Sequence, residues 1–330
     1  MNRVVDTAVV AAAVSVGVLF GAPCPAGPPS DAPPPARKGR GQFQAACVAL
    51  VRACDGELAE QVKLLRAGAA TEGEVDVVRL ALAGARQELA LVEGRPAAAV
   101  EQSRALVAIR ERELDRLLKL PGRGDVGAVE ALAARRQVAN ARRWLAREER
   151  SPGGAARHLR EVIELCDAEV RALQTLARRG IAVPEEVDAG RRRLAYARYR
   201  LAREEGRAEG AAEQLRITVQ LREQDLKRTR QVDDGTAEAA QDVDWHHVLL
   251  LEARQRQAVF AGDAPAAREH LGRRLAVLER MSRRQREVLP ADRVLRASLE
   301  YQLALVRYQL ALASEGVPLV DGDPLYELDY

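Results

Sequence analysis

Residues 242–247, with the sequence DVDWHH, form the densest group of potential metal ligands in the chain. On a helix, residues four positions apart share a face, so Asp242 and His246 have the spacing that helical zinc sites use. Two ligands do not complete a zinc site, and no other His or Cys motif supplies the rest. The Val-Asp pair inside the run also recurs at residues 75–76 and 187–188. We therefore expect the run to begin an exposed helix without binding metal.

No recognised catalytic motif occurs elsewhere in the sequence. It contains no nucleophile elbow, no glycine-rich phosphate loop, no zinc-protease motif and no kinase signature. The cysteines do not form a disulfide framework, although a bridge between Cys54 and Cys166 stays open. The sequence predicts a protein with no enzymatic activity, no cofactor and no bound metal.

Composition points to long helices that must position any functional side chain. The 330 residues are 47% hydrophobic and 30% charged, but only 3% are aromatic, which is few for the core and pocket of an enzyme. The 51 basic and 48 acidic residues give a net charge of +3, which offers no whole-chain electrostatic basis for binding nucleic acid. Abundant Ala, Leu, Arg and Glu instead predict helices packed on one another.

A sequence unit of about 56 residues repeats along the chain, with a slightly shorter step before the last copy. An Ala-Arg pair recurs at residues 85–86, 141–142, 197–198 and 253–254, ending in Val-Arg at 306–307. Alanines in the other half of the unit repeat as Ala99, Ala155, Ala211 and Ala267. Each half has apolar residues at steps of three and four, as one helix does. We predict an all-α fold of tandem antiparallel hairpins, arranged as an α-solenoid or as an extended coiled-coil-like array.

Ten helices joined by short turns are expected in a repeat domain covering residues 42–315. Gly68 and Gly180 stand where helices should end, and Pro184 suits the first turn of the next helix. The expected helices cover residues 42–67, 72–93, 97–120, 127–149, 154–179, 184–205, 209–231, 238–260, 265–288 and 291–314.

Five arginines share one position of the repeat and would align as a ladder in a stacked array. They are Arg86, Arg142, Arg198, Arg254 and Arg307. One interpretation is a solvated face held by ion pairs that contribute little each. The other is an interaction stripe for an acidic partner or for anionic lipid headgroups.

The N-terminus has the features of an export signal. Residues 1–22 combine a short basic start with an apolar run that is shorter than the roughly 20 residues of a membrane span, so we expect a signal peptide or N-terminal anchor. Cys24 follows small residues and is a possible lipidation site, although Pro23 departs from the lipoprotein pattern. Residues 23–41 read as a proline-rich linker, and residues 316–330 as an irregular C-terminal tail.

Residues 180–188, followed by Leu194, Ala197 and Leu201, resemble the helical-hairpin signature of TolC-type outer-membrane efflux proteins and of membrane-fusion (periplasmic adaptor) proteins. Residues 68–89 repeat the likeness. It covers the hairpins only, because no segment has the pattern of a lipoyl domain or a membrane barrel. The resemblance implies, as an alternative function, a component of a cell-envelope efflux or secretion assembly.

The sequence as a whole predicts an exported helical-repeat scaffold or protein-interaction module. We expect an extracytoplasmic location, in the periplasm or cell envelope, and a protein partner there. Nucleic acid is not expected as a partner. Contact with a membrane is expected only through the N-terminus, if it is uncleaved or lipidated.

Overall fold

The computed structural model describes residues 17–18, 40–120, 124–233, 235–288, 293–315, 319 and 323–324. These ranges hold α2 (Arg40–Arg66), α3 (Glu72–Val92), α4 (Pro96–Leu118), α5 (Gly124–Glu148), α6 (Pro152–Arg178), α7 (Pro184–Glu204), α8 (Ala208–Gln231), α9 (Ala237–Phe260), α10 (Ala264–Val288) and α11 (Arg293–Ser314). Two short strands, β1 (Gly17–Val18) and β2 (Asp323–Pro324), pair antiparallel. The all-α prediction is confirmed, and every helix end lies within three residues of the expected one.

The N-terminal predictions fall largely outside the described residues. The expected signal or anchor, most of the proline-rich linker and the possible lipidation site Cys24 all lie there, apart from β1. Helix α2 begins at Arg40, two residues before the expected start of the repeat domain. In the C-terminal tail, Leu319 packs against the core formed by α9, α10 and α11. No helix in the described ranges is long and apolar enough to cross a membrane.

Local sequence explains the hairpin turns. After α2, the N–H of Gly68 donates to the carbonyl of Leu65, and Ala69 donates to Leu64. Gly68 has a φ of 71°, a left-handed conformation that glycine adopts without the steric cost of a Cβ. Thr71 and Glu74 then form a capping box that starts α3.

The helices form two layers, which differ in how many of their side chains are buried. Within residues 81–90 of α3, only Arg86 is exposed. Helix α4, by contrast, buries just Ala99, Ser103 and Ile109. We call α3, α5, α7, α9 and α11 the inner helices. The helices α2, α4, α6, α8 and α10 are the outer helices, each packed between two inner ones.

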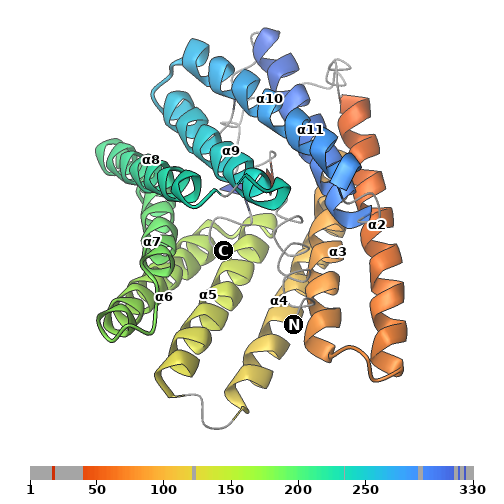
Figure 1. Ribbon diagram of the computed structural model, residues 1–330, viewed down its shortest axis with the longest axis vertical. Coiled ribbons are helices and arrows are strands. Elements are labelled where there is room, and N and C mark those ends of the chain that lie inside the picture. Colours follow the sequence, from red (N-terminus) through yellow and green to blue (C-terminus); the bar gives the residue numbers. More distant parts are fainter. Residues whose placement is uncertain are drawn as a thin grey trace.

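The array closes into a ring. Each helix contacts its sequence neighbours, and α11 also packs against α2, as Figure 1 shows on the right of the molecule. Helix α2 is the second half of a repeat unit and α11 is a first half, so the two ends of the chain complete one unit. The sequence left open stacked or extended hairpins. The hairpins stack side by side, and the stack curves until it meets itself.

We call the packing of α2 between α11 and α3 the seam. Phe43 lies there, one repeat before Ala99, at a position that is alanine in the other outer helices. Its ring is fully buried, with ring centroids 5.4 Å from Tyr301 and 5.6 Å from Tyr308 of α11. The seam therefore holds three of the few aromatic residues in the chain.

Three buried cysteines are free thiols. Cys47 and Cys54 belong to the seam core, whereas Cys166 lies in a separate core formed by α5 to α8. Burial raises the pKa of the Cys54 thiol to about 12 and that of Cys166 to about 11. Because Cys54 and Cys166 are free thiols in separate cores, the bridge between them that the sequence left open is not formed.

Candidate interaction surface

Every arginine of the ladder pairs with a carboxylate on the preceding outer helix. The pairs are Arg86–Asp55 at 2.8 Å, Arg142–Glu111 at 2.7 Å, Arg198–Asp167 at 3.7 Å, Arg254–Glu223 at 2.7 Å and Arg307–Glu279 at 2.8 Å. The five acids themselves share one position of the repeat. Sequence reasoning missed this acidic series, although the same periodicity could have found it.

The ladder lies on the outside of the ring and joins inner to outer helices. Its side chains are about one-third to one-half exposed, so each pair contributes on the order of 0–1 kcal/mol. The acidic residues at the ends of inner helices behave similarly, since Glu149 accepts from Arg104 at 2.7 Å and Glu205 from Arg160 at 3.0 Å. These contacts favour the solvated-face interpretation, and the interaction stripe stays a prediction.

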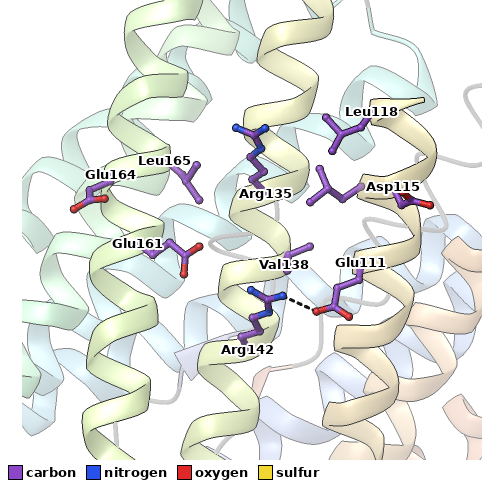
Figure 2. Close-up of a pocket in the computed structure, with 10 residues that line it drawn as sticks. Glu111, Asp115, Leu118, Arg135, Val138, Arg142, Glu161, Glu164 and Leu165 are labelled. Atoms are coloured by element: carbon purple, nitrogen blue, oxygen red, sulfur yellow. Dashed lines mark hydrogen bonds and ion pairs between the residues drawn. The ribbon is translucent and has the colours of Figure 1, made fainter. Parts of the chain in front are cut away.

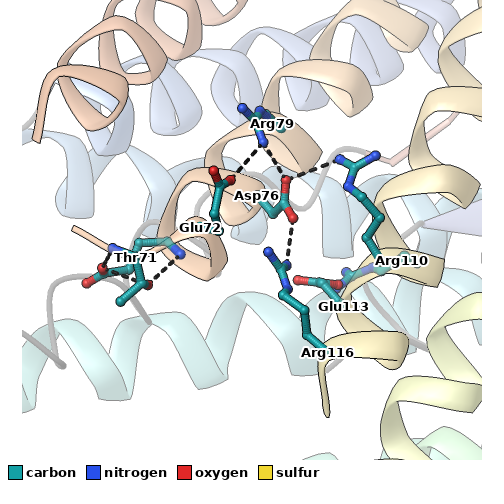
Figure 3. A network of polar contacts seen from close by, with 9 residues as sticks. Thr71, Glu72, Asp76, Arg79, Arg110, Glu113 and Arg116 are labelled. Carbon is teal, nitrogen blue, oxygen red and sulfur yellow. Dashed lines mark hydrogen bonds and ion pairs between the residues drawn. The ribbon is translucent and has the colours of Figure 1, made fainter. Parts of the chain in front are cut away.

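A more buried ion-pair network holds the start of α3 against the end of α4. The carboxylate of Asp76 accepts from Arg79 at 2.9 Å and from Arg116 at 2.6 Å (Figure 3). It also accepts from Arg112 at 3.2 Å. Burial raises the pKa of Asp76, but the hydrogen bonds from these guanidinium groups outweigh it and leave the pKa below its usual value. Asp76 therefore stays ionised and serves as a structural anion.

The Asp–Arg ion pair of this network recurs in copies that have both an aspartate and an arginine at these positions. Asp188 pairs with Arg228 at 2.8 Å, as Asp76 does with Arg116, and in both pairs the same interval of sequence separates the two residues. In the copy between them Leu132 replaces the aspartate, and Ala172 replaces the arginine. The two halves of the network have thus been kept or lost together.

The candidate metal cluster is part of this network. Asp244 accepts from Arg280 at 2.9 Å and from Arg284 at 3.1 Å, so its carboxylate is already neutralised by two guanidinium groups. Burial lowers the pKa of His246, and Asp242 and His246 do not gather further ligands. In the part of the chain that the structure describes, no group of three or more His, Cys, Asp or Glu residues could hold a metal ion.

A surface groove of about 450 Å³ runs between the outer helices α4 and α6, with the inner helix α5 beneath it. Figure 2 shows α5 in the middle, carrying Arg135 and Arg142, with α4 and α6 on either side. The lining residues are Glu111, Leu114, Asp115, Leu118, Arg135, Val138, Arg142, Glu161, Glu164 and Leu165. Leu118 is 53% exposed, so the groove presents an apolar surface to solvent.

Three acidic residues make this groove different from the rest of the ring. Each of them has neutral or basic counterparts in the other repeats. The counterparts of Asp115 are Ala59, Arg171, Lys227 and Arg283, and those of Glu161 are Ala49, Ala105, Ile217 and Arg273. The counterparts of Glu164 are Arg52, Ala108, Gln220 and Ala276. The sequence contains this signal as three departures from the repeat. It was missed because the lining comes from three helices whose packing the sequence does not show.

The acidic groups of the groove are only partly neutralised. Glu111 pairs with Arg142, Asp115 with Lys119 at 2.5 Å, and Glu161 accepts from His158 at 3.2 Å. Glu164 is exposed and has no ion-pair partner among the described residues. The lining therefore combines four carboxylates with two arginines and with leucines on both walls, an arrangement suited to binding a cationic, partly apolar surface.

A scan of protein-family models and a search of curated proteins each return no match to this chain.

Proposed function

We propose that this protein is a non-enzymatic scaffold that binds another protein, and that the closed helical ring holds the binding surface in a fixed shape. The observation that carries the proposal is the groove between α4 and α6. It combines the exposed Leu118 and the partly exposed Leu114 and Leu165 with three carboxylates whose repeat positions are neutral or basic in the other copies. The N-terminal sequence further supports a location in the cell envelope, where we place the partner.

The internal repeats help to separate structural residues from residues with another role. A residue that every hairpin needs should recur in each copy, as the ladder arginines and their carboxylate partners do. A residue confined to one copy can still be structural when it is buried, as Phe43 is, but Glu164 is exposed. Glu164 has no ion-pair partner within the described chain, so we assign it to a surface that acts on something outside the chain.

Capture from cell-envelope extract tests the proposal. The bait proteins are the wild type, a groove variant (Asp115→Asn, Glu161→Gln, Glu164→Gln) and a matched control that removes three exposed carboxylates elsewhere (Glu101→Gln, Glu209→Gln, Glu300→Gln). We expect one partner that the wild type and the control retain and the groove variant loses. Failure of the wild type to retain any partner more strongly than the groove variant does would contradict the proposal.

The alternative, a component of an efflux or secretion assembly, rests on the hairpin resemblance. The longest described helices, α2 and α6, have 27 residues, or about 40 Å at 1.5 Å per residue. A closed ring of such helices predicts a compact particle in small-angle scattering. A long rod would favour the alternative, because hairpins that cross the periplasm must be extended.

A further inference from the structure

We infer that the groove between α4 and α6 accepts a basic amphipathic helix of the partner protein. The inference rests on the proposed function, since it names the kind of partner for the same groove. Its support comes from the shape of the groove, the distribution of its charges and the contrast with the other repeats.

The shape suits a helix laid along two parallel ridges. Helices α4 and α6 form the walls, and Leu114, Leu118 and Leu165 supply apolar contacts from the two walls, whereas Val138 of α5 is buried beneath them. In Figure 2, Leu118 and Leu165 come from opposite walls and both point toward the space above α5. A helix bound in such a groove places apolar residues into it at positions i, i+3, i+4 and i+7. About 450 Å³ holds a few such side chains, while the backbone of the bound helix lies above.

The charges select basic residues on the flanks of that helix. Asp115 lies on the α4 wall, and Glu161 and Glu164 lie on the α6 wall. In Figure 2, Glu161 points toward the space above α5, while the carboxylates of Asp115 and Glu164 lie on the far sides of the two walls, beyond Leu118 and Leu165. Arg142 is paired with Glu111, which leaves Arg135 as the other cation of the lining. Lysines or arginines flanking the apolar face of a bound helix would meet these carboxylates. Such rim contacts chiefly set specificity, association rate and salt dependence.

The other repeats explain why one groove is singled out. At the position of Asp115, three of the remaining copies carry Arg171, Lys227 and Arg283, which would repel a basic helix. An acidic helix or an anionic lipid surface would be repelled by the α4–α6 groove for the opposite reason.

Two labelled synthetic peptides of about 18 residues, or five helical turns, test the inference by fluorescence anisotropy. Both carry leucines on one face, and the flanks are lysine in one peptide and glutamate in the other. We expect the lysine peptide to bind the wild type at least tenfold more tightly than the Asp115→Asn, Glu161→Gln, Glu164→Gln variant, with affinity falling as salt rises. The control with Glu101→Gln, Glu209→Gln and Glu300→Gln should match the wild type.

Charge reversal provides the second arm. A variant with Asp115→Lys, Glu161→Lys and Glu164→Lys should bind the glutamate peptide and lose the lysine peptide, while its circular dichroism stays that of the wild type because all three side chains are exposed. Equal affinity of the lysine peptide for the wild type and the groove variant would overturn the inference. If envelope capture still depends on the groove, the proposed function stands and only the partner class is wrong. If envelope capture shows no dependence on the groove either, both fail.

Discussion

The seam and the junction of α5, α6 and α7 are built from equivalent helices of the repeat but are held together by different kinds of side chain. At the seam, Phe43 fills the position that is Ala155 in α6, and its ring stacks on Tyr308. In the α5–α6–α7 junction, the buried carboxylate of Glu169 accepts from Arg136 at 2.9 Å and from Arg193 at 2.6 Å. One junction is closed by aromatic packing, and the other by a buried triad of charges.

A third junction shows that the geometry requires neither solution. Where α9 and α10 meet, the counterparts of Arg136 and Glu169 are Val248 and Met281, both in one apolar core. The seam differs in another respect, because no turn connects α11 to α2, which lie at opposite ends of the array. Tyr301 of α11 donates to Glu88 of α3 across 213 residues of sequence. We infer that the aromatic residues provide at the seam the attachment that a short turn provides elsewhere.

Removing the seam aromatic should have the largest effect. Phe43→Ala leaves a cavity beside Tyr301 and Tyr308, and a buried Phe→Ala change costs about 3–5 kcal/mol. We expect lower stability in denaturant and earlier labelling of Cys47 and Cys54 than of Cys166, read by mass spectrometry of the modified peptides. Ala155→Gly, at the equivalent position of α6, should cost only about 1 kcal/mol. Equal labelling of all three cysteines would show that the ring opens as one unit.

Breaking the charge triad should cost nearly as much. Glu169→Leu strands the buried guanidinium groups of Arg136 and Arg193, and removing one partner of a buried ion pair costs about 3–5 kcal/mol. Met281→Leu at the equivalent position of α10 should cost less than about 1.5 kcal/mol, because volume and polarity are nearly kept. Urea unfolding of both variants measures the contrast. Similar losses would mean that the triad contributes no more than its packing.

The buried Glu88 at the seam should make stability depend on pH. Burial raises its pKa to about 8, from 4.5 in the unfolded chain. Between these values the folded state keeps a proton that the unfolded state has lost, so stability falls as pH rises, by at most about 1.4 kcal/mol per unit. Glu88→Gln keeps an acceptor for Tyr301 and removes the titration. We expect the variant to gain stability over the wild type from pH 5 to pH 8 in denaturant titrations. A constant difference across this range would contradict the prediction, and Glu101→Gln, at an exposed site, is the control.

Removing a ladder arginine should have the smallest effect on stability, and the effect should be the same beside the seam and in the α5–α6–α7 junction. Arg86→Ala beside the seam and Arg198→Ala in the α5–α6–α7 junction each remove one half-exposed ion pair worth roughly 0–1 kcal/mol. In thermal melts, the melting temperatures of both variants should approach that of the wild type as salt rises, because salt screens the ion pair in the wild type. A much larger loss for Arg86→Ala would mean that the ladder takes part in closing the ring.

The helices and their ends were predictable because their signals are local. Apolar spacing, glycine after a helix and Thr, Ser or Pro before the next act within a few residues, so they can be read directly. The groove was less accessible. Asp115 and Glu164 depart from the residues at equivalent repeat positions, but only the packing of α4 and α6 over α5 shows that they line one groove. The repeat period predicted the ladder of arginines, whereas the acidic series of Asp55 and its counterparts, which has the same period, was missed.

The sequence alone determined the all-α class, the repeat unit and the places where each helix begins and ends. The tertiary structure decided that α11 meets α2, that Phe43 stacks on Tyr308 and that the arginine ladder is paired. The physical reason is that closure depends on a small rotation between successive hairpins, summed over the whole array. No single residue specifies that sum, so contacts between distant helices appear only when all the copies are assembled.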